Sequence, residues 1–193
     1  MTQSALIQGG SGGLGRALVN RILQSNQFDQ VVVTGRNIQT IDSRDPRIIP
    51  IELDLLSDQS VVDASTAVAS QIDKLNLVMT TAGILQDESL GLKPEKKLTD
   101  LSRSNLQMVF SVNCFGPFLW YAALGRLIRH REPITIATLS ARVASIGDNR
   151  LGGWHSYRAS KTAQNMLVCV FNGFTEREHF FSRCTKKCRK HSQ

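Results

Sequence analysis

The chain has few of the features that mark secreted or membrane-spanning proteins. Its 193 residues include four cysteines, which are too few and too scattered for a disulfide framework. No uninterrupted apolar run reaches the roughly 18 residues that a membrane span requires. The N-terminus lacks the basic start and cleavage-site pattern of a signal peptide. We therefore expect a reduced, cytoplasmic protein without a membrane partner.

Metal ligands at recognisable spacing are also lacking. Cys184 and Cys188, with His179 and His191 nearby, come closest to a metal-binding group. Their spacing matches no common zinc pattern. We expect no metal site.

The positive charge is concentrated at one end of the chain. The formal net charge is +7, and residues 173–193 hold six Lys or Arg against two Glu. The other residues carry 17 basic and 14 acidic side chains, so the main part of the chain is only mildly basic. A high isoelectric point that comes from a short tail is poor support for nucleic-acid binding, and we expect no nucleic-acid partner.

Short apolar runs alternate with longer stretches of helical periodicity. Strands are predicted at 5–9, 31–35, 47–54, 75–83 and 133–140, and helices at 13–25, 57–72, 98–131 and 154–171. Runs rich in Val, Ile and Leu indicate strands that are buried on both faces, and helices between them indicate right-handed βαβ units. The sequence therefore predicts an α/β fold with a doubly wound parallel sheet.

A glycine-rich segment, GGSGGLG at Gly9–Gly15, joins the first predicted strand to the first predicted helix. Free N–H groups and the helix dipole favour an anion at such a helix N-terminus. Glycines allow the backbone to turn tightly and to approach a phosphate closely. The segment is either a phosphate loop or an ordinary tight turn, and its place between strand and helix favours the phosphate loop.

Several motifs occur together in one order. Gly9, Gly13 and Gly15 have G-x-x-x-G-x-G spacing, TTAG ends the fourth predicted strand, SVNCFGP lies in a predicted helix, and SYRASK contains a Tyr-x-x-x-Lys pair. The sequence resembles the short-chain dehydrogenase/reductase family over about residues 4–171. GLKPEKKLTDL and SIGDNRLGGWHSYRASK also resemble the C-factor-like, cell-to-cell signalling subgroup.

The resemblance implies a single Rossmann domain over residues 1–171 that binds a dinucleotide. It implies cofactor contacts from Gly9, Ser11, Gly12, Gly13, Leu14, Gly15, Arg36, Asp54, Leu55, Thr81, Ala82, Gly83, Tyr157 and Lys161.

The end of the second predicted strand bears on the choice of cofactor. An acid there usually binds the ribose hydroxyls of NAD, whereas NADP calls for a cation that binds its 2′-phosphate. The strand ends in VVVTGRN, and arginine binds phosphate in a bidentate way. Arg36 therefore favours NADP(H) over NAD(H), although it could also be a solvated loop charge. Asp54 resembles the family's aspartate near the adenine ring, or it could cap the helix that begins near Ser57.

Tyr157 and Lys161 are four residues apart in a predicted helix and therefore share a face. They could be a surface pair. Alternatively, the ammonium could lower the phenol pKa from its ordinary value of about 10, so that Tyr157 exchanges a proton with a carbonyl or an alcohol. The resemblance implies that Lys161 also binds the nicotinamide ribose. It further implies that Ser140 hydrogen-bonds the substrate oxygen and that Asn113 holds a water linked to Lys161.

The sequence departs from the family after Met166. The family continues with a further parallel strand and a Pro-Gly turn, whereas residues 168–193 contain no proline and no convincing strand. Asn172-Gly173 favours a helix stop, and residues 172–193 are expected to form a basic, poorly ordered tail. The fifth strand would then be an edge strand, and a family-type homodimer or homotetramer could be disturbed.

Two functions are therefore considered. The first is an NADP(H)-dependent oxidoreductase that acts on a small-molecule carbonyl or alcohol. The alternative is a catalytically weak or inactive dinucleotide-binding protein with an interaction or regulatory role.

Overall fold

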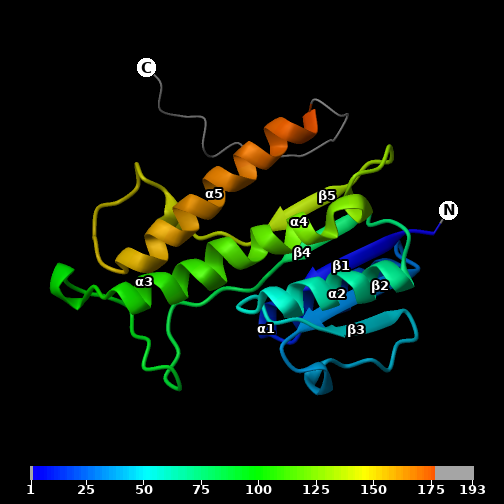
Figure 1. Ribbon diagram of the computed structural model, residues 1–193, viewed down its shortest axis with the longest axis horizontal. Helices are drawn as coiled ribbons and strands as arrows, with labels where there is room; N and C mark the ends of the chain where they lie inside the picture. The colour runs from blue at the N-terminus through cyan, green and yellow to red at the C-terminus, as the bar shows by residue number, and fades with distance from the viewer. Residues whose placement is uncertain (1, 177–193) are drawn as a thin grey trace. The chain divides into compact units, whose positions relative to one another are not determined.

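The structure is a computed structural model in which the backbone is described for residues 2–176 (Figure 1). The chain forms two compact units, one of Met1–Ala82 and Gly116–Leu139, the other of Gly83–Phe115 and Ser140–Gln193. Most of the predicted basic tail, with its two cysteines, lies outside the described residues. The predicted boundary near residue 171 stays a prediction.

The first unit contains a parallel sheet of five strands in the order β3-β2-β1-β4-β5. The strands are β1 (Ser4–Gln8), β2 (Gln30–Gly35), β3 (Ile48–Glu52), β4 (Leu77–Thr80) and β5 (Thr135–Thr138). All five fall within or overlap the predicted ranges, which confirms the parallel α/β class. Strand β5 is the outer strand beside β4 in the described sheet, as expected.

The central strands are buried because their aliphatic side chains point to both faces of the sheet. Leu6 of β1 lies beside Val32 of β2 and Val78 of β4, and all three are fully buried. On the α1 side, Ile7 and Val33 belong to a core cluster with residues of α1. Burial of this kind contributes roughly 1.5–3 kcal/mol for each large aliphatic side chain.

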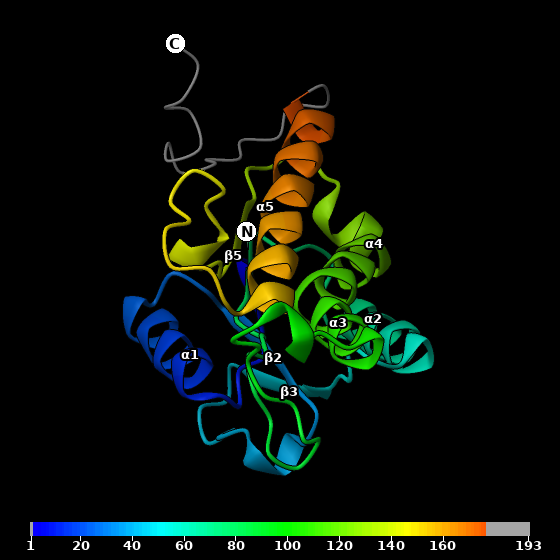
Figure 2. The same cartoon turned by 90° about the vertical axis from the view of Figure 1, so that its left-hand side faces the viewer.

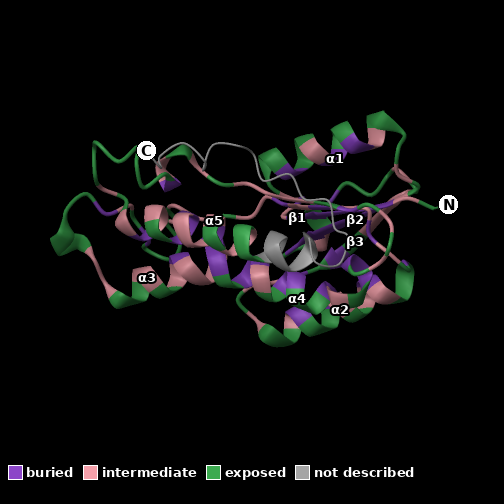
Figure 3. Ribbon diagram, turned by 90° about the horizontal axis from the view of Figure 1, so that it is seen from above, coloured by how far each residue is buried: buried purple, intermediate pink, exposed green. Residues whose placement is uncertain are grey.

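Three helices of the first unit cover the two faces of this sheet. They are α1 (Gly13–Ser25), α2 (Asp58–Gln71) and α4 (Gly116–Ile128). Helix α1 lies on one face, and α2 and α4 lie on the other (Figure 3). The Ser57 hydroxyl accepts a hydrogen bond from the Ser60 N–H at the start of α2, which confirms the predicted cap.

The second unit contains helices and irregular segments. Its helices are α3 (Arg103–Phe110) and α5 (His155–Glu176), with the π-helix η3 (Ser111–Phe115) and the 3-10 turns η2 (Leu98–Asp100) and η4 (Arg142–Ala144). Helix α5 packs against α3, η3 and η4 (Figure 2 views the same cartoon from the side).

Two helix predictions need correction. The helix predicted at 98–131 is divided into η2, α3, η3 and α4, because a 3-10 turn ends at Asp100 and a π-helical turn lies at Ser111–Phe115. Helix α5 also continues to Glu176, past Asn172-Gly173. A glycine inside a helix costs about 1 kcal/mol relative to alanine, which a long helix can tolerate.

One helical stretch bears on membrane association. By length and composition, Arg103–Ile128 could cross a membrane, although no apolar run of that length was expected. Within its most apolar window, 44% of the residues are buried. Core helices of soluble proteins have the same properties, so this stretch alone is weak evidence for a membrane span.

Candidate active site

Glycine is required at two positions of the turn after β1. Gly9 has a φ of +82°, and a Cβ there would lie 2.8 Å from Thr81 Oγ1 and 2.9 Å from the Ala82 nitrogen. A Cβ at Gly15 would lie 2.2 Å from the Gly9 carbonyl oxygen. The turn therefore brings Gly9, Gly15, Thr81 and Ala82 together within the first unit.

The N-terminus of α1 has the properties of an anion site. Gly12 is the N-cap without a side-chain cap, and the first turn has no acidic residue. The first helical hydrogen bond runs from Arg16 N to Gly12 O, so the N–H groups of Gly13, Leu14 and Gly15 have no acceptor within the helix. A Cβ at Gly13 would meet nothing within 4 Å, so there is open space beside these donors. These features fit the pyrophosphate of a dinucleotide.

The other predicted cofactor contacts in the first unit are accessible. Ser11 lies against Gly35 at the end of β2, and Arg36 follows as an exposed side chain. Asp54 accepts a hydrogen bond from Leu56 N at 3.0 Å, and Leu55 is partly buried. Since Ser57 caps α2, the alternative role of Asp54 as the helix cap is wrong.

Asn113 is held in the π-helix η3 of the second unit. Its Oδ1 accepts from the Ile84 N–H at 2.6 Å, and its Nδ2 donates to the Ile84 carbonyl at 2.8 Å. Nδ2 also lies 3.1 Å from Ser160 Oγ, whose hydroxyl donates to the Tyr157 carbonyl at 2.8 Å. Asn113 therefore ties the chain after β4 to the helix that carries Tyr157. Single π-helical turns are frequent at functional sites.

Lys161 is a buried cation beside Asn113. It is 3% exposed, and its Nζ donates to Gln164 Oε1 at 3.0 Å. A Cβ at Gly83 would lie 3.2 Å from this Nζ and 3.4 Å from Asn113 Oδ1, so Gly83 leaves room for both. Burial lowers the pKa of Lys161 to about 8, partly opposed by the electrostatic effect of Cys114. The structure thus brings Gly83, Asn113 and Lys161 together, and a surface position for Lys161 is wrong.

Tyr157 differs from the expectation in its electrostatics. Burial raises the pKa of its phenol above the ordinary value, with no opposing effect from Lys161. The expected lowering by the ammonium is therefore wrong for the chain without a ligand, because desolvation favours the neutral phenol. The Trp154 ring meets the Tyr157 ring edge-on, with centroids 6.4 Å apart. Ser140 follows β5 as an exposed residue, and no described side chain hydrogen-bonds its hydroxyl or that of Tyr157.

Sequence reasoning missed two polar residues of α5. Gln164 is fully buried and accepts from Lys161, and Ser160 is fully buried between Asn113 and Tyr157. Each lies three residues after a predicted catalytic residue, on the same helix face. Polar residues at that spacing are the signal that could have identified them.

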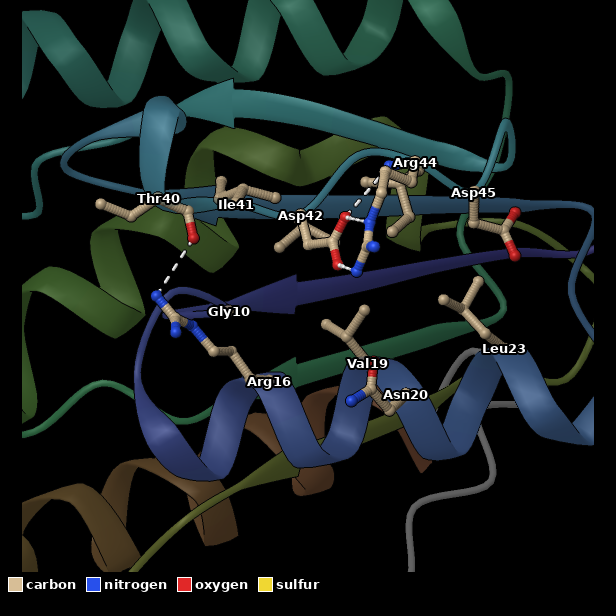
Figure 4. A pocket seen from close by; sticks show the side chains of 12 residues that line it. Gly10, Arg16, Val19, Asn20, Leu23, Thr40, Ile41, Asp42, Arg44 and Asp45 are labelled. Carbon is tan, nitrogen blue, oxygen red and sulfur yellow. Dashed lines mark hydrogen bonds and ion pairs between the residues drawn. The ribbon is translucent and has the colours of Figure 1, made fainter.

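A cavity of about 520 Å³ lies beside α1 in the first unit (Figure 4). Val19, Val33 and Ile41 form part of its apolar lining. Its arginines already have partners, since Arg16 donates to the Thr40 carbonyl and Arg44 pairs with Asp42. None of the predicted cofactor contacts lines the cavity. The cavity adjoins the glycine turn through Gly10 and Arg16.

Relatives in sequence are oxidoreductases. An uncharacterized oxidoreductase of Schizosaccharomyces pombe is 25% identical over 180 residues, covering 90% of this chain and 68% of that protein. A 1-hydroxy-2-glutathionyl-2-methyl-3-butene dehydrogenase of Rhodococcus sp. is 30% identical over 120 residues, covering 62% and 49%. Human 3-keto-steroid reductase/17-beta-hydroxysteroid dehydrogenase 7 is 24% identical over 208 residues, covering 89% and 61%. The chain spans about half to two thirds of the length of these relatives.

Solved structures share the fold. An NADPH-bound carbonyl reductase from chicken fatty liver has a TM-score of 0.79 and 23% identity, covering 93% of this chain and 73% of that chain. The carbonyl reductase Sniffer of D. melanogaster has a TM-score of 0.82 and 22% identity, covering 94% and 79%. The family model described as short chain dehydrogenase matches residues 3–172. The chain therefore belongs to the short-chain dehydrogenase family, whose members are oxidoreductases.

Proposed function

We propose that this protein is an NADP(H)-dependent oxidoreductase that interconverts a small-molecule carbonyl and alcohol, with Tyr157 as the general acid and base. The main support is the buried Lys161 ammonium, which is on the same helix as Tyr157 and lies beside Gly83 and Asn113. Burying an ammonium costs free energy unless the charge is paired and hydrogen-bonded. Perturbed ionisable groups of this kind cluster at functional sites.

Cofactor binding is assigned to both the glycine turn and the residues that follow β2. The free N–H groups at the start of α1 would hold the pyrophosphate, and Arg36 would bind a 2′-phosphate. The chicken carbonyl reductase, a solved structure that shares the fold, is NADPH-bound, which supports NADP(H) for this chain as well. When bound, the reduced nicotinamide supplies a hydride to a carbonyl carbon.

The protein's own residues supply the proton. A tyrosine phenol has an ordinary pKa of about 10, and burial raises that of Tyr157, so the phenol keeps its proton at neutral pH and can donate it to a carbonyl oxygen. Ser140 would hydrogen-bond the same substrate oxygen, because its exposed hydroxyl is open to a ligand. Lys161 would bind the nicotinamide ribose, and Asn113 would fix the backbone beside it and hold the linked water.

Two measurements test this proposal. Titration with NADPH should quench or blue-shift its fluorescence emission, and NADH should bind more weakly. A panel of carbonyl substrates should reveal NADPH oxidation that Tyr157→Phe lowers by about 10²–10⁴-fold, the usual range for a general acid. If the two proteins have equal rates, Tyr157 has no catalytic role.

The alternative function is dinucleotide binding without turnover, with an interaction or regulatory role. Two observations favour it: the Lys161 ammonium donates to Gln164, and burial raises the pKa of Tyr157. NADPH binding without oxidation of the cofactor by any carbonyl in the panel would support this alternative.

We also propose a C-factor-like subgroup, a cytoplasmic location and a homodimer or homotetramer, with a catalytic domain over residues 1–171. Light scattering would test the oligomer, and limited proteolysis would test the domain boundary. Fractionation of cells would test the location.

A further inference from the structure

Glu95 is a buried acid whose charge the proposed reaction does not use. It is 3% exposed, and it lies in the irregular segment 84–101 of the second unit. Among the described residues, Glu95 and Lys161 are the two buried side chains of the Asp, Glu, Lys and Arg types. Because burying a charge is costly unless hydrogen bonds satisfy it, the partners of Glu95 indicate its task.

Those partners are the residues directly before Tyr157. The Ser156 hydroxyl donates to Glu95 Oε1, and the Ser156 N–H donates to Oε2 at 3.3 Å. The Trp154 N–H donates to the Glu95 carbonyl oxygen at 2.6 Å. Ser156 itself is 1% exposed. Both the side chain and the backbone of Glu95 therefore hold the start of α5.

The start of α5 needs such support from outside the helix. The first N–H groups of a helix have no acceptor within it, and a carboxylate at that end is favourable. The preceding connection is conformationally costly, because Trp154 has a φ of +51° and follows Gly152 and Gly153 at +63° and +69°. The bonds to Glu95 hold the residues at the start of α5 from outside the helix.

We propose that Glu95 is a positioning residue: by capping α5 through Ser156, it fixes the orientation of the Tyr157 phenol toward the reacting carbonyl. This inference rests on the proposed function and deepens it, because it names the residue that holds the general acid. Tyr157 is the next residue after Ser156, so a shift of the first turn moves its ring directly. The Trp154 ring, which lies against Tyr157, would move with it.

The phenol can be observed without turnover, because the chain has two tyrosines, Tyr121 and Tyr157. Tyr121 is buried and hydrogen-bonded to Thr80 and Thr138. A spectrophotometric titration near 295 nm follows phenolate formation, and subtraction of the Tyr157→Phe curve isolates Tyr157. The ionisable groups around the start of α5 are Glu95, His155, Arg158, Lys161 and the nearby Asp100, with exposed Lys96 and Lys97 on the Glu95 segment.

The test compares two variants that change the same hydrogen bond from opposite sides, one at the donor and one at the acceptor. Ser156→Ala removes the hydroxyl without a change of charge, and Glu95→Gln removes the charge. We expect each to lower kcat for NADPH-dependent carbonyl reduction by about 10-fold, with the NADPH Kd changed less than about 2-fold. The Tyr157 midpoint should fall by about half a pH unit toward its ordinary value, because the phenol becomes more exposed to water. The double variant should be no worse than either single one.

Glu88→Gln is the matched control, since Glu88 is an exposed acid of the same segment, and it should match the wild type. Glu95→Asp, which keeps the charge, should restore part of kcat. If Glu95→Gln does not fold, Ser156→Ala carries the test alone. An unchanged Tyr157 titration and an unchanged kcat in folded Ser156→Ala would overturn the proposal. If the wild type reduces no carbonyl, the proposed function fails, and the titration still decides whether Glu95 positions Tyr157.

Discussion

The two compact units differ in the kinds of side chain that they bury. In the first unit, the central strands bury aliphatic side chains such as Leu6, Val32 and Val78, and glycine contacts determine the turn before α1. In the second, the buried groups include Glu95, Asn113 and Lys161, which hydrogen bonds hold in place. The first unit therefore depends mainly on aliphatic packing and glycine contacts. The second depends more on buried polar groups, such as Glu95 and Asn113, whose partners lie far apart in the sequence.

The largest effect should come from breaking the shape of the first unit. Gly15→Ala places a Cβ 2.2 Å from the Gly9 carbonyl, so we expect a loss of about 4 kcal/mol in the free energy of unfolding. NADPH binding should weaken by more than about 100-fold, because the α1 N-terminus must shift. Gly13→Ala is the matched control, since its Cβ meets nothing within 4 Å and alanine favours the helix. Urea unfolding would measure the stability of both variants, and an NADPH titration would measure their affinity. Equal stability of Gly15→Ala and Gly13→Ala would contradict the steric account.

A smaller loss of stability should follow when a hydrogen-bonding side chain is removed from the polar network of the second unit. Asn113→Ala leaves the Ile84 N–H and carbonyl without their side-chain partner. Leaving buried groups unpaired costs about 1–3 kcal/mol each, so we expect a loss of about 2–3 kcal/mol in chemical denaturation. Gln107→Ala, at an exposed position of α3, should change stability by less than about 0.5 kcal/mol. A neutral Asn113→Ala would mean that water replaces the amide.

A still smaller change in free energy is expected for the preference between NADPH and NADH when Arg36 is replaced. Arg36→Asp replaces a cation that would attract a 2′-phosphate with a repelling anion. The ratio of the Kd values for NADPH and NADH should shift toward NADH by about 10-fold or more, which corresponds to about 1.4 kcal/mol. Arg21→Asp makes the same charge change at an exposed position of α1 and should leave the ratio unchanged. An unaltered ratio in Arg36→Asp would remove Arg36 as the selector.

The smallest effect is a pH dependence of stability from Lys161. Burial lowers its pKa to about 8 from 10.5, so between these pH values the unfolded chain binds more protons than the folded one. Stability from this group therefore rises with pH over that window and is lowest below pH 8. Relative to Lys161→Met, the wild type should gain about 2 °C in Tm between pH 7 and about pH 8.5, an interval over which this group recovers about 0.8 kcal/mol. A difference that stays constant with pH would show that Lys161 is not desolvated.

Local patterns predicted the first unit well. Helix α1 begins and ends where its sequence predicted, at Gly13 and Ser25, because glycine spacing and apolar periodicity are local. The burial of Lys161 and its place beside Asn113 agree with the motifs.

The remaining features depend on long-range contacts. The Glu95–Ser156 bond joins residues 61 positions apart, and no local signal marks it. The pKa of Tyr157 was predicted in the wrong direction because spacing to Lys161 carries no information on burial. The π-helical turn at Ser111–Phe115 was likewise unexpected, since its sequence continues a helical pattern.

The hydrogen bonds between Glu95 and the start of α5 have a consequence for protein engineering. Exposed loops ordinarily accept insertions and can be exchanged between homologues. A one-residue insertion between Leu92 and Glu95 would pull the carboxylate away from Ser156, so this loop should be intolerant of changes in length. A chimera that receives α5 from another family member should therefore receive segment 84–101 from the same donor.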